Sequence, residues 1–195
     1  MKKLGLFLLI GTLLFSCSKD VLDRTIFIPD ENDNRLPAYT EWGYNTFGAK
    51  YERDYFLASN EIVPCKILYR GNLLQFSLTG TIRDSKEMTL SFIFPAPQMT
   101  DYKDLLQLHN FEIDLSALDC TVKMVQDSNE TILDVFEGKL YFKRNQLLSV
   151  DDQVNRVILS GIFELYYLKN DFPTSISNGR FDLGITKNLF YSYQN

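Results

Sequence analysis

The feature that most constrains the fold is a period-two alternation of apolar and polar side chains, which recurs between residues 74 and 185. Apolar residues or glycine occupy every second position from Leu74 to Ile82, and polar or charged residues fill the positions between them. Successive side chains of a strand point to opposite faces, so this pattern predicts a strand with one buried face. Similar alternation is found at 88–94, 111–115, 120–124, 140–142, 157–167 and 181–185.

Turn-forming residues separate these segments, and only one connection has a helical pattern. The turn residues stand at 70–72, 84–86, 126–129 and 177–179. The helical candidate is 100–109, where Thr100 can cap the first turn and several leucines can pack on a sheet. Strands at this spacing predict an all-β fold, an antiparallel β-sandwich with one short covering helix, or a β-barrel as the alternative.

The composition is that of a globular protein and argues against several function classes. Apolar residues make up 45% of the chain and charged residues 23%, which excludes a disordered chain. The 25 acidic residues outnumber the 20 basic ones, whereas nucleic-acid affinity depends on clustered Lys and Arg. A single His excludes a multi-His zinc site. We therefore expect no metal, no cofactor and no nucleic-acid partner.

The N-terminus has the pattern of a bacterial lipoprotein signal peptide. Two lysines precede an apolar segment from Leu4 to Phe15, whose helical length of about 18 Å is short of a hydrocarbon core of about 30 Å. Leu14-Phe15-Ser16-Cys17 resembles a lipobox, although Phe15 replaces the usual small residue. We expect residues 1–16 to be cleaved and Cys17 to carry acyl chains such as palmitate.

The residues after Cys17 indicate where the lipid places the protein. Ser18 stands where an Asp would imply inner-membrane retention, and Ser18-Lys19-Asp20 is similar to the short charged signal that sends Bacteroidota lipoproteins to the cell surface. We expect a lipid-anchored outer-membrane protein, on the cell surface rather than the periplasmic face. Residues 17–37 are polar and acidic and predict a tether, and residues 38–195 predict one β-sandwich domain.

Three motifs resemble a known group of proteins. The sequence 159–165 contains a G-x-F-[DE] strand, 176–183 contains an N-G-x-F-D core, and 44–49 accompanies them. Together they resemble uncharacterised single-domain lipoproteins of gut Bacteroidales, known only as domains of unknown function. The resemblance implies a β-sandwich and an outer-membrane location, and it carries no catalytic residues.

The residues of these motifs have a structural interpretation. Gly161, on the inward face of a strand, leaves room for a large neighbour or marks a bulge. Asn178-Gly179 supplies the positive φ of a hairpin turn. Asp182 is expected on the solvent side, where it could bond Arg180 or the turn backbone.

Other residue types leave alternatives open. Cys65 and Cys120 could form a disulfide outside the cytoplasm, or remain as two buried free thiols. His109 stands where the helix is expected to end, which the helix dipole explains. Six aromatic residues crowd positions 42–56, and they either fill the core or stack on a glycan. Under the second interpretation the ligand-stacking candidates are Trp42, Tyr44, Tyr51 and Tyr55.

These observations predict a location more clearly than a function. The leading hypothesis is a non-catalytic module that binds a glycan or an envelope protein partner, or assembles the envelope. The alternative is an envelope hydrolase that acts on glycans through paired carboxylates. A cleft with two carboxylates about 5–10 Å apart would favour the hydrolase.

Overall fold

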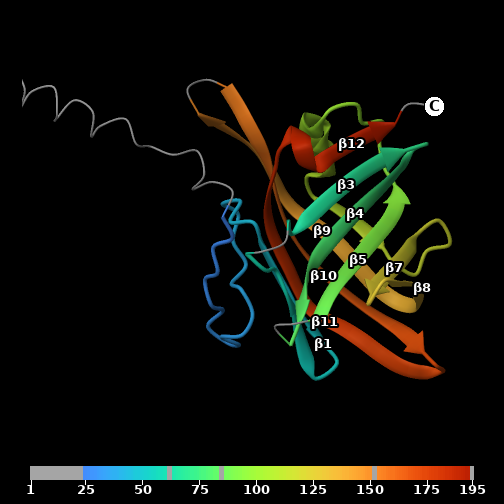
Figure 1. The fold of residues 1–195 in the computed structure, drawn as a ribbon. Helices are drawn as coiled ribbons and strands as arrows, with labels where there is room; N and C mark the ends of the chain where they lie inside the picture. The colour runs from blue at the N-terminus through green and yellow to red at the C-terminus, as the bar shows by residue number, and fades with distance from the viewer. Residues whose placement is uncertain (1–23, 61–62, 84–85, 151–152, 194–195) are drawn as a thin grey trace, which may run out of the picture.

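Twelve strands form one continuous hydrogen-bonded sheet that folds over into two layers (Figure 1). The computed structural model describes residues 24–60, 63–83, 86–150 and 153–193. The predicted signal peptide and Cys17 therefore lie outside the described residues. The strands are β1 (Thr46–Tyr51), β2 (Asp54–Leu57), β3 (Cys65–Arg70), β4 (Leu73–Ile82), β5 (Lys86–Pro95), β6 (Phe111–Asp114), β7 (Thr121–Gln126), β8 (Asn129–Ile132), β9 (Asp134–Val150), β10 (Gln153–Lys169), β11 (Phe172–Ile185) and β12 (Phe190–Tyr193).

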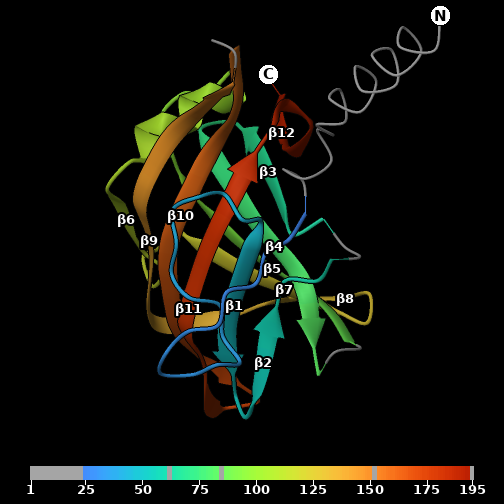
Figure 2. The same ribbon diagram turned by 90° about the vertical axis from the view of Figure 1, so that its left-hand side faces the viewer.

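The strand order explains how one sheet makes two layers (Figure 2). One layer has the order β6-β9-β10-β11-β1-β2, and the other is built from β12, β3, β4, β5, β7 and β8. They join at a corner where β2 pairs with the last two residues of β4, while β3 takes the rest of that edge. No pairing among the described residues joins β6 to β8, so the sheet is not closed into a barrel. The prediction of an all-β, sandwich-like fold is confirmed, and the barrel alternative is wrong.

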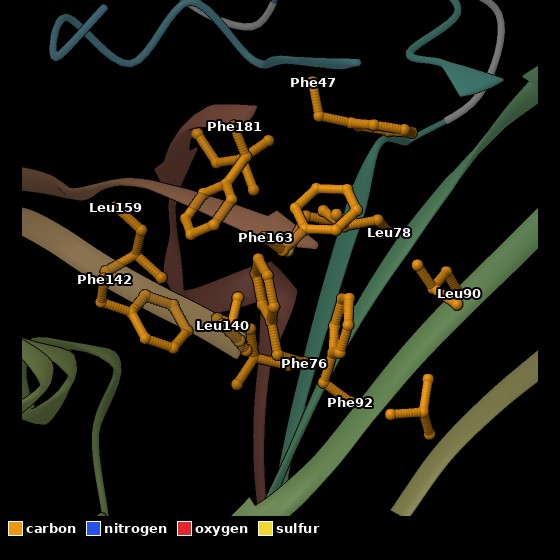
Figure 3. Close-up of a cluster of buried hydrophobic side chains, with 14 of the residues drawn as sticks. Phe47, Phe76, Leu78, Leu90, Phe92, Leu140, Phe142, Leu159, Phe163 and Phe181 are labelled. Atoms are coloured by element: carbon orange, nitrogen blue, oxygen red, sulfur yellow. The ribbon is translucent and has the colours of Figure 1, made fainter. Parts of the chain in front are cut away.

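Phenylalanine rings from both layers meet in the core (Figure 3). The ring of Phe76 in β4 lies 5.3 Å from that of Phe142 in β9 and 5.1 Å from that of Phe181 in β11. In β5, Phe92 contacts Phe163 of β10, with centroids 5.4 Å apart. All five rings are at most 1% exposed. The alternating apolar positions thus face one shared core, as the period-two pattern predicts.

A short helix packs on β9 and β10, but it differs in detail from the expected one. It is a 3-10 helix, η2 (Tyr102–Leu108), rather than a helix over 100–109. Asp101, not Thr100, is the N-cap, because its carboxylate accepts a hydrogen bond from the Lys103 N–H. Tyr102, Leu105 and Leu108 are buried. A second 3-10 helix, η3 (Lys187–Leu189), precedes β12.

His109 has a structural role at the end of η2. Its backbone N–H bonds the Leu106 carbonyl, and its Nδ1 accepts a hydrogen bond from the backbone N–H of Asn145, 3.2 Å away. The Asn145 side chain also donates to the carbonyl of Leu105. His109 therefore helps to attach the helix to β9.

The turn expected at 177–179 is wrong, because these residues lie within β11. Phe163 pairs with Gly179 and Leu165 pairs with Ile176, so β11 has one residue more than β10 between these pairs, which makes a β-bulge. Asn178 has a φ of 52° there, so the positive φ is present but serves a bulge. The β10–β11 turn is formed by Asn170 and Asp171, both with positive φ.

Two other predicted turns are confirmed. Gly71 and Asn72 connect β3 to β4, and Asp127 and Ser128 connect β7 to β8, all with positive φ. The turn expected at 84–86 lies mostly outside the described residues.

Residues 26–38 form an N-terminal strap that lies against the domain. The N–H of Ile26 bonds the Tyr44 carbonyl at 2.8 Å, and Pro29 and Pro37 form an isolated β-bridge. Leu36 is fully buried, and the Asp30 carboxylate pairs with Arg180. This part of the predicted tether is thus attached to the sheet. Its apolar residues Ile26–Ile28 do not form a strand.

The strap is also held through Asp33. Its carboxylate accepts a hydrogen bond from the Tyr55 hydroxyl at 2.8 Å and lies 3.1 Å from the ammonium of Lys50. The hydrogen bond from Tyr55, with those from Lys50 and Arg35, holds the pKa of Asp33 well below its usual value. The carboxylate is therefore ionised at neutral pH, where it pairs with both cations.

Candidate binding pockets

Asp182 is buried, which corrects the expectation that it faces solvent. Its side chain lies under the loop 40–44 and is 1% exposed. The carboxylate accepts hydrogen bonds from three successive backbone N–H groups, of Trp42, Gly43 and Tyr44, at 3.0, 2.7 and 3.3 Å. Two hydroxyls donate to it as well, from Thr40 and Ser160. Asp182 thus fixes this loop to the sheet, and Arg180 pairs with Asp30 instead.

Gly161 has the role that its place in the motif predicts. A Cβ added to it would lie 2.2 Å from the carbonyl oxygen of Tyr141 and 2.5 Å from the ring of Phe181. The absent side chain therefore leaves room for Phe181. Gly161 and Asp182 themselves thus serve architecture. Other residues of the same two motifs, among them Ile162, Glu164 and Arg180, line a pocket of about 410 Å³ together with Tyr39, Lys139 and Lys143.

The aromatic residues of 42–56 do not share one exposed surface. Tyr51 is 5% exposed and belongs to the core, with Phe47 and Phe56. Tyr55 is partly buried, and the guanidinium of Arg35 lies 4.4 Å above its ring. Tyr44 is partly buried, and Trp42 is 70% exposed. Of the four ligand-stacking candidates, only Trp42 presents most of its surface to solvent.

Cys65 and Cys120 are free thiols, so the disulfide alternative does not hold. The strands β3, β4, β5 and β7 are successive neighbours, and Cys120 precedes β7. Cys65 is therefore three strand spacings, about 14 Å, from the line of β7. Bonded cysteines have Cα atoms less than about 7 Å apart. Burial raises the pKa of both thiols, which disfavours the nucleophilic thiolate.

One pocket, of about 440 Å³, opens where β1 and β3 begin and β11 ends. We call it the amide pocket, because the side chains of Asn45, Asn60 and Asn188 line it. Asn45 has a φ of 53°, and its Oδ1 accepts a hydrogen bond from the N–H of Gly184 at 3.0 Å. That bond fixes the start of β1 against the end of β11. Asn60 and Asn188 are exposed and come from the β2–β3 connection and η3.

The lining of the amide pocket is neutral. Three amides and the hydroxyls of Thr25 and Thr186 offer both donors and acceptors. No charged side chain of the described residues lines it. Apolar surface comes from Val63, Pro64, Cys65, Leu183, Ile185 and Leu189. Such a lining suits an uncharged, hydroxyl-rich ligand better than an ion.

The paired carboxylates of a hydrolase are absent from the described lining of the amide pocket and of three further pockets. A second neutral pocket lies between Tyr69, Gln98 and Tyr193. A third pocket contains one carboxylate, that of Asp54, which forms an ion pair with Arg83. A fourth pocket also contains one carboxylate, that of Glu164, which forms an ion pair with Lys139. Asp151 and Asp152 are a pair of carboxylates adjacent in the sequence, and they lie outside the described residues.

Comparisons with family models, curated proteins and solved structures return no match for this chain. The resemblance to Bacteroidales lipoproteins therefore stays a prediction from the sequence motifs. Within residues 24–60, 63–83, 86–150 and 153–193, no group of three His, Cys, Asp or Glu side chains is placed to hold a metal ion. In the same ranges, no helix has the length and hydropathy to cross a membrane.

The sequence did not indicate the amide pocket. Its residues come from positions 25, 45, 60, 63–65, 183–186 and 188–189, and no spacing relates them. Only Asn45 and Leu183 belong to the motifs of the sequence analysis. A pocket of this kind becomes visible when the ends of distant strands are placed together.

Proposed function

We propose that the chain is a lipid-anchored lipoprotein of the outer membrane, on the cell surface rather than the periplasmic face, and that it acts by binding rather than catalysis. The observation that supports the binding role is the amide pocket, whose described lining has no charged side chain and is rich in hydrogen-bonding groups. Its ligand is a neutral sugar unit of a glycan, whose hydroxyls match amide donors and acceptors. Its volume is within the usual range for small-molecule sites.

The alternative of a glycan hydrolase has less support. Such an enzyme needs an acid and a second carboxylate flanking the scissile bond. None of the pockets described above contains two carboxylates. The buried carboxylate of Asp182 already accepts hydrogen bonds from five donors of the protein, so it is not available to act on a substrate.

Cys17→Ala tests the anchor. We expect the variant to leave the membrane fraction and appear in the soluble fraction, because acyl chains contribute about 0.8 kcal/mol for each buried methylene. Immunoblots of fractionated cells measure this, with Cys120→Ala as the control that keeps the anchor. Unchanged membrane association of Cys17→Ala would refute the lipid attachment.

Asn60→Ala combined with Asn188→Ala tests the amide pocket. We expect the detergent-solubilised full chain to bind neutral oligosaccharides on a glycan array, and the double variant to bind at least tenfold more weakly. Two lost hydrogen bonds of about 1 kcal/mol each account for that factor. Asn129→Ala, an exposed substitution in β8, is the matched control.

Three outcomes would contradict the pocket's role. They are the absence of any glycan ligand, equal binding by the double variant and the control, and the release of shorter glycans during incubation. The last outcome would favour the hydrolase.

A further inference from the structure

A second pocket, lined by charged side chains rather than by amides, lies at the end of β1 opposite to the amide pocket. Arg35 of the strap, Arg53 of the β1–β2 turn and Arg83 at the end of β4 line a shallow pocket of about 380 Å³. Tyr55, Leu57 and Asp54 complete its lining. Three arginines and one carboxylate thus line this pocket, in a chain whose net charge is −5, and a second carboxylate, that of Asp33, bonds Arg35 beside it. We call this pocket the arginine site.

The arginines are held in place by their surroundings. Arg83 has a φ of 53°, and its Nε donates to the Asp54 carboxylate at 2.8 Å. Arg35 donates through Nε to Asp33 at 3.1 Å, and its guanidinium lies over the Tyr55 ring. Two of the three guanidiniums are therefore oriented before any ligand arrives.

The same contacts leave donors unused. Both ion pairs use the Nε atom, and the Nη groups of Arg35 and Arg83 make no hydrogen bond to the described residues. Within the same residues, Arg53 makes no hydrogen bond or ion pair. The guanidinium fork matches the paired oxygens of an oxyanion, which accepts two parallel hydrogen bonds. The arginine site thus has free donors, and its excess positive charge is that of Arg53, since Asp33 and Asp54 pair with the other two arginines.

We propose that the arginine site binds the carboxylate or sulfate group of an acidic oligosaccharide. The anionic group bridges the free donors of the arginines, and the sugar ring rests on Leu57 and the exposed part of Tyr55. This inference rests on the proposed glycan-binding function and adds a second subsite to it. Thr25, near the start of the described chain, lies in the amide pocket at the opposite end of β1. An N-terminal anchor would therefore leave the arginine site pointing away from its own membrane.

Arg53→Gln is the decisive variant, because Arg53 supports no native contact among the described residues. The full chain in detergent is titrated calorimetrically with trigalacturonate and with a sulfated disaccharide. We expect binding of at least one, a tenfold or greater loss in Arg53→Gln, and weakening as NaCl is raised. Arg70→Gln, an exposed arginine at the end of β3, is the matched control and should bind as the natural chain does.

Three further probes test whether the site requires a charged group and whether that group must belong to a saccharide. Maltotriose, inorganic phosphate and a hexaglutamate peptide are titrated in the same way. Binding of maltotriose that Arg53→Gln weakens would overturn the requirement for charge, and binding of phosphate or the peptide without either saccharide would overturn the assigned class. No binding of any acidic probe at 10 mM, or equal binding by Arg53→Gln and Arg70→Gln, would overturn the site. The Asn60→Ala, Asn188→Ala variant should retain acidic-probe binding, so failure at one pocket is distinguishable from failure at the other.

Discussion

Replacing Asp182 with asparagine is expected to lower the free energy of unfolding by about 3–4 kcal/mol. The carboxylate accepts from five donors while almost fully buried, and three of them are consecutive N–H groups of one loop. An amide of the same shape keeps one acceptor oxygen and directs an NH₂ group at these donors. Buried donors then lose their partner, and the loop 40–44 loses its attachment to β11.

Urea unfolding at pH 7 measures this effect. Trp42 is the single tryptophan and lies within the loop, so its fluorescence reports loop release as well as global unfolding. Asp134→Asn, at an exposed position of β9, is the matched control and should change stability by less than about 0.5 kcal/mol. A loss below about 1 kcal/mol in Asp182→Asn would show that the loop does not depend on the carboxylate.

Phe76→Ala is expected to cost about 4 kcal/mol. Phe76 is fully buried at the contact between the layers, and its ring meets those of Phe92, Phe142 and Phe181. Truncation removes the apolar contact and leaves a cavity bounded by strands that are hydrogen-bonded on both sides. The core cannot collapse freely around it, so most of the cavity cost should remain.

The control for this truncation is Phe172→Ala. Phe172 is 74% exposed beside the β10–β11 turn, so its loss should change stability by less than about 0.5 kcal/mol. Phe76→Leu, which keeps most of the volume, should lie between the two variants. Thermal unfolding of all three separates cavity formation from the mere loss of a ring. Equal stabilities of Phe76→Ala and Phe172→Ala would contradict the assignment of the core.

Alternation in the sequence predicted segments that lie in or overlap β4, β5, β6, β7, β9, β10 and β11, and it did not predict β1, β2, β3, β8 or β12. β4 and β5 bury alternate side chains apart from the buried Ser77 and Ser91, and β10 does so from Gly161 to Tyr167, so their apolar period is visible. β1 is buried on nearly every residue, because the core covers one face and the strap and loop 40–44 cover the other. β8 is exposed at all four positions. Neither pattern alternates, and β2 and β12 are too short for a period to show.

The motif residues were found from sequence, but two of their roles were not. Asn178 does adopt a positive φ, yet both a turn and a bulge require that conformation. Choosing between them needs the register of β11 against β10. Asp182 occupies an outward position of its strand, which normally means solvent. Only the distant loop 40–44, folded over that face, makes the position buried.

The two pockets could not have been found from sequence for a similar reason. The arginine site combines Arg35, Arg53 and Arg83 from three separate connections. Each arginine alone is an ordinary surface residue in a polar segment. Their convergence depends on the corner at which β2 joins β4, and that corner is a property of the whole sheet.

If Cys17 carries the proposed lipid, the strap would also limit how far the domain can stand from the bilayer. Were the chain free from Cys17 to Pro37, its contour length would allow a separation of up to about 70 Å. Because Ile26 and the residues after it contact the domain, the free segment would be limited to the residues between Cys17 and Ile26, which span about 30 Å at full extension. With an acylated Cys17, the amide pocket would sit close above the lipid headgroups. The arginine site, about 20 Å farther along β1, would meet the molecules that arrive from outside.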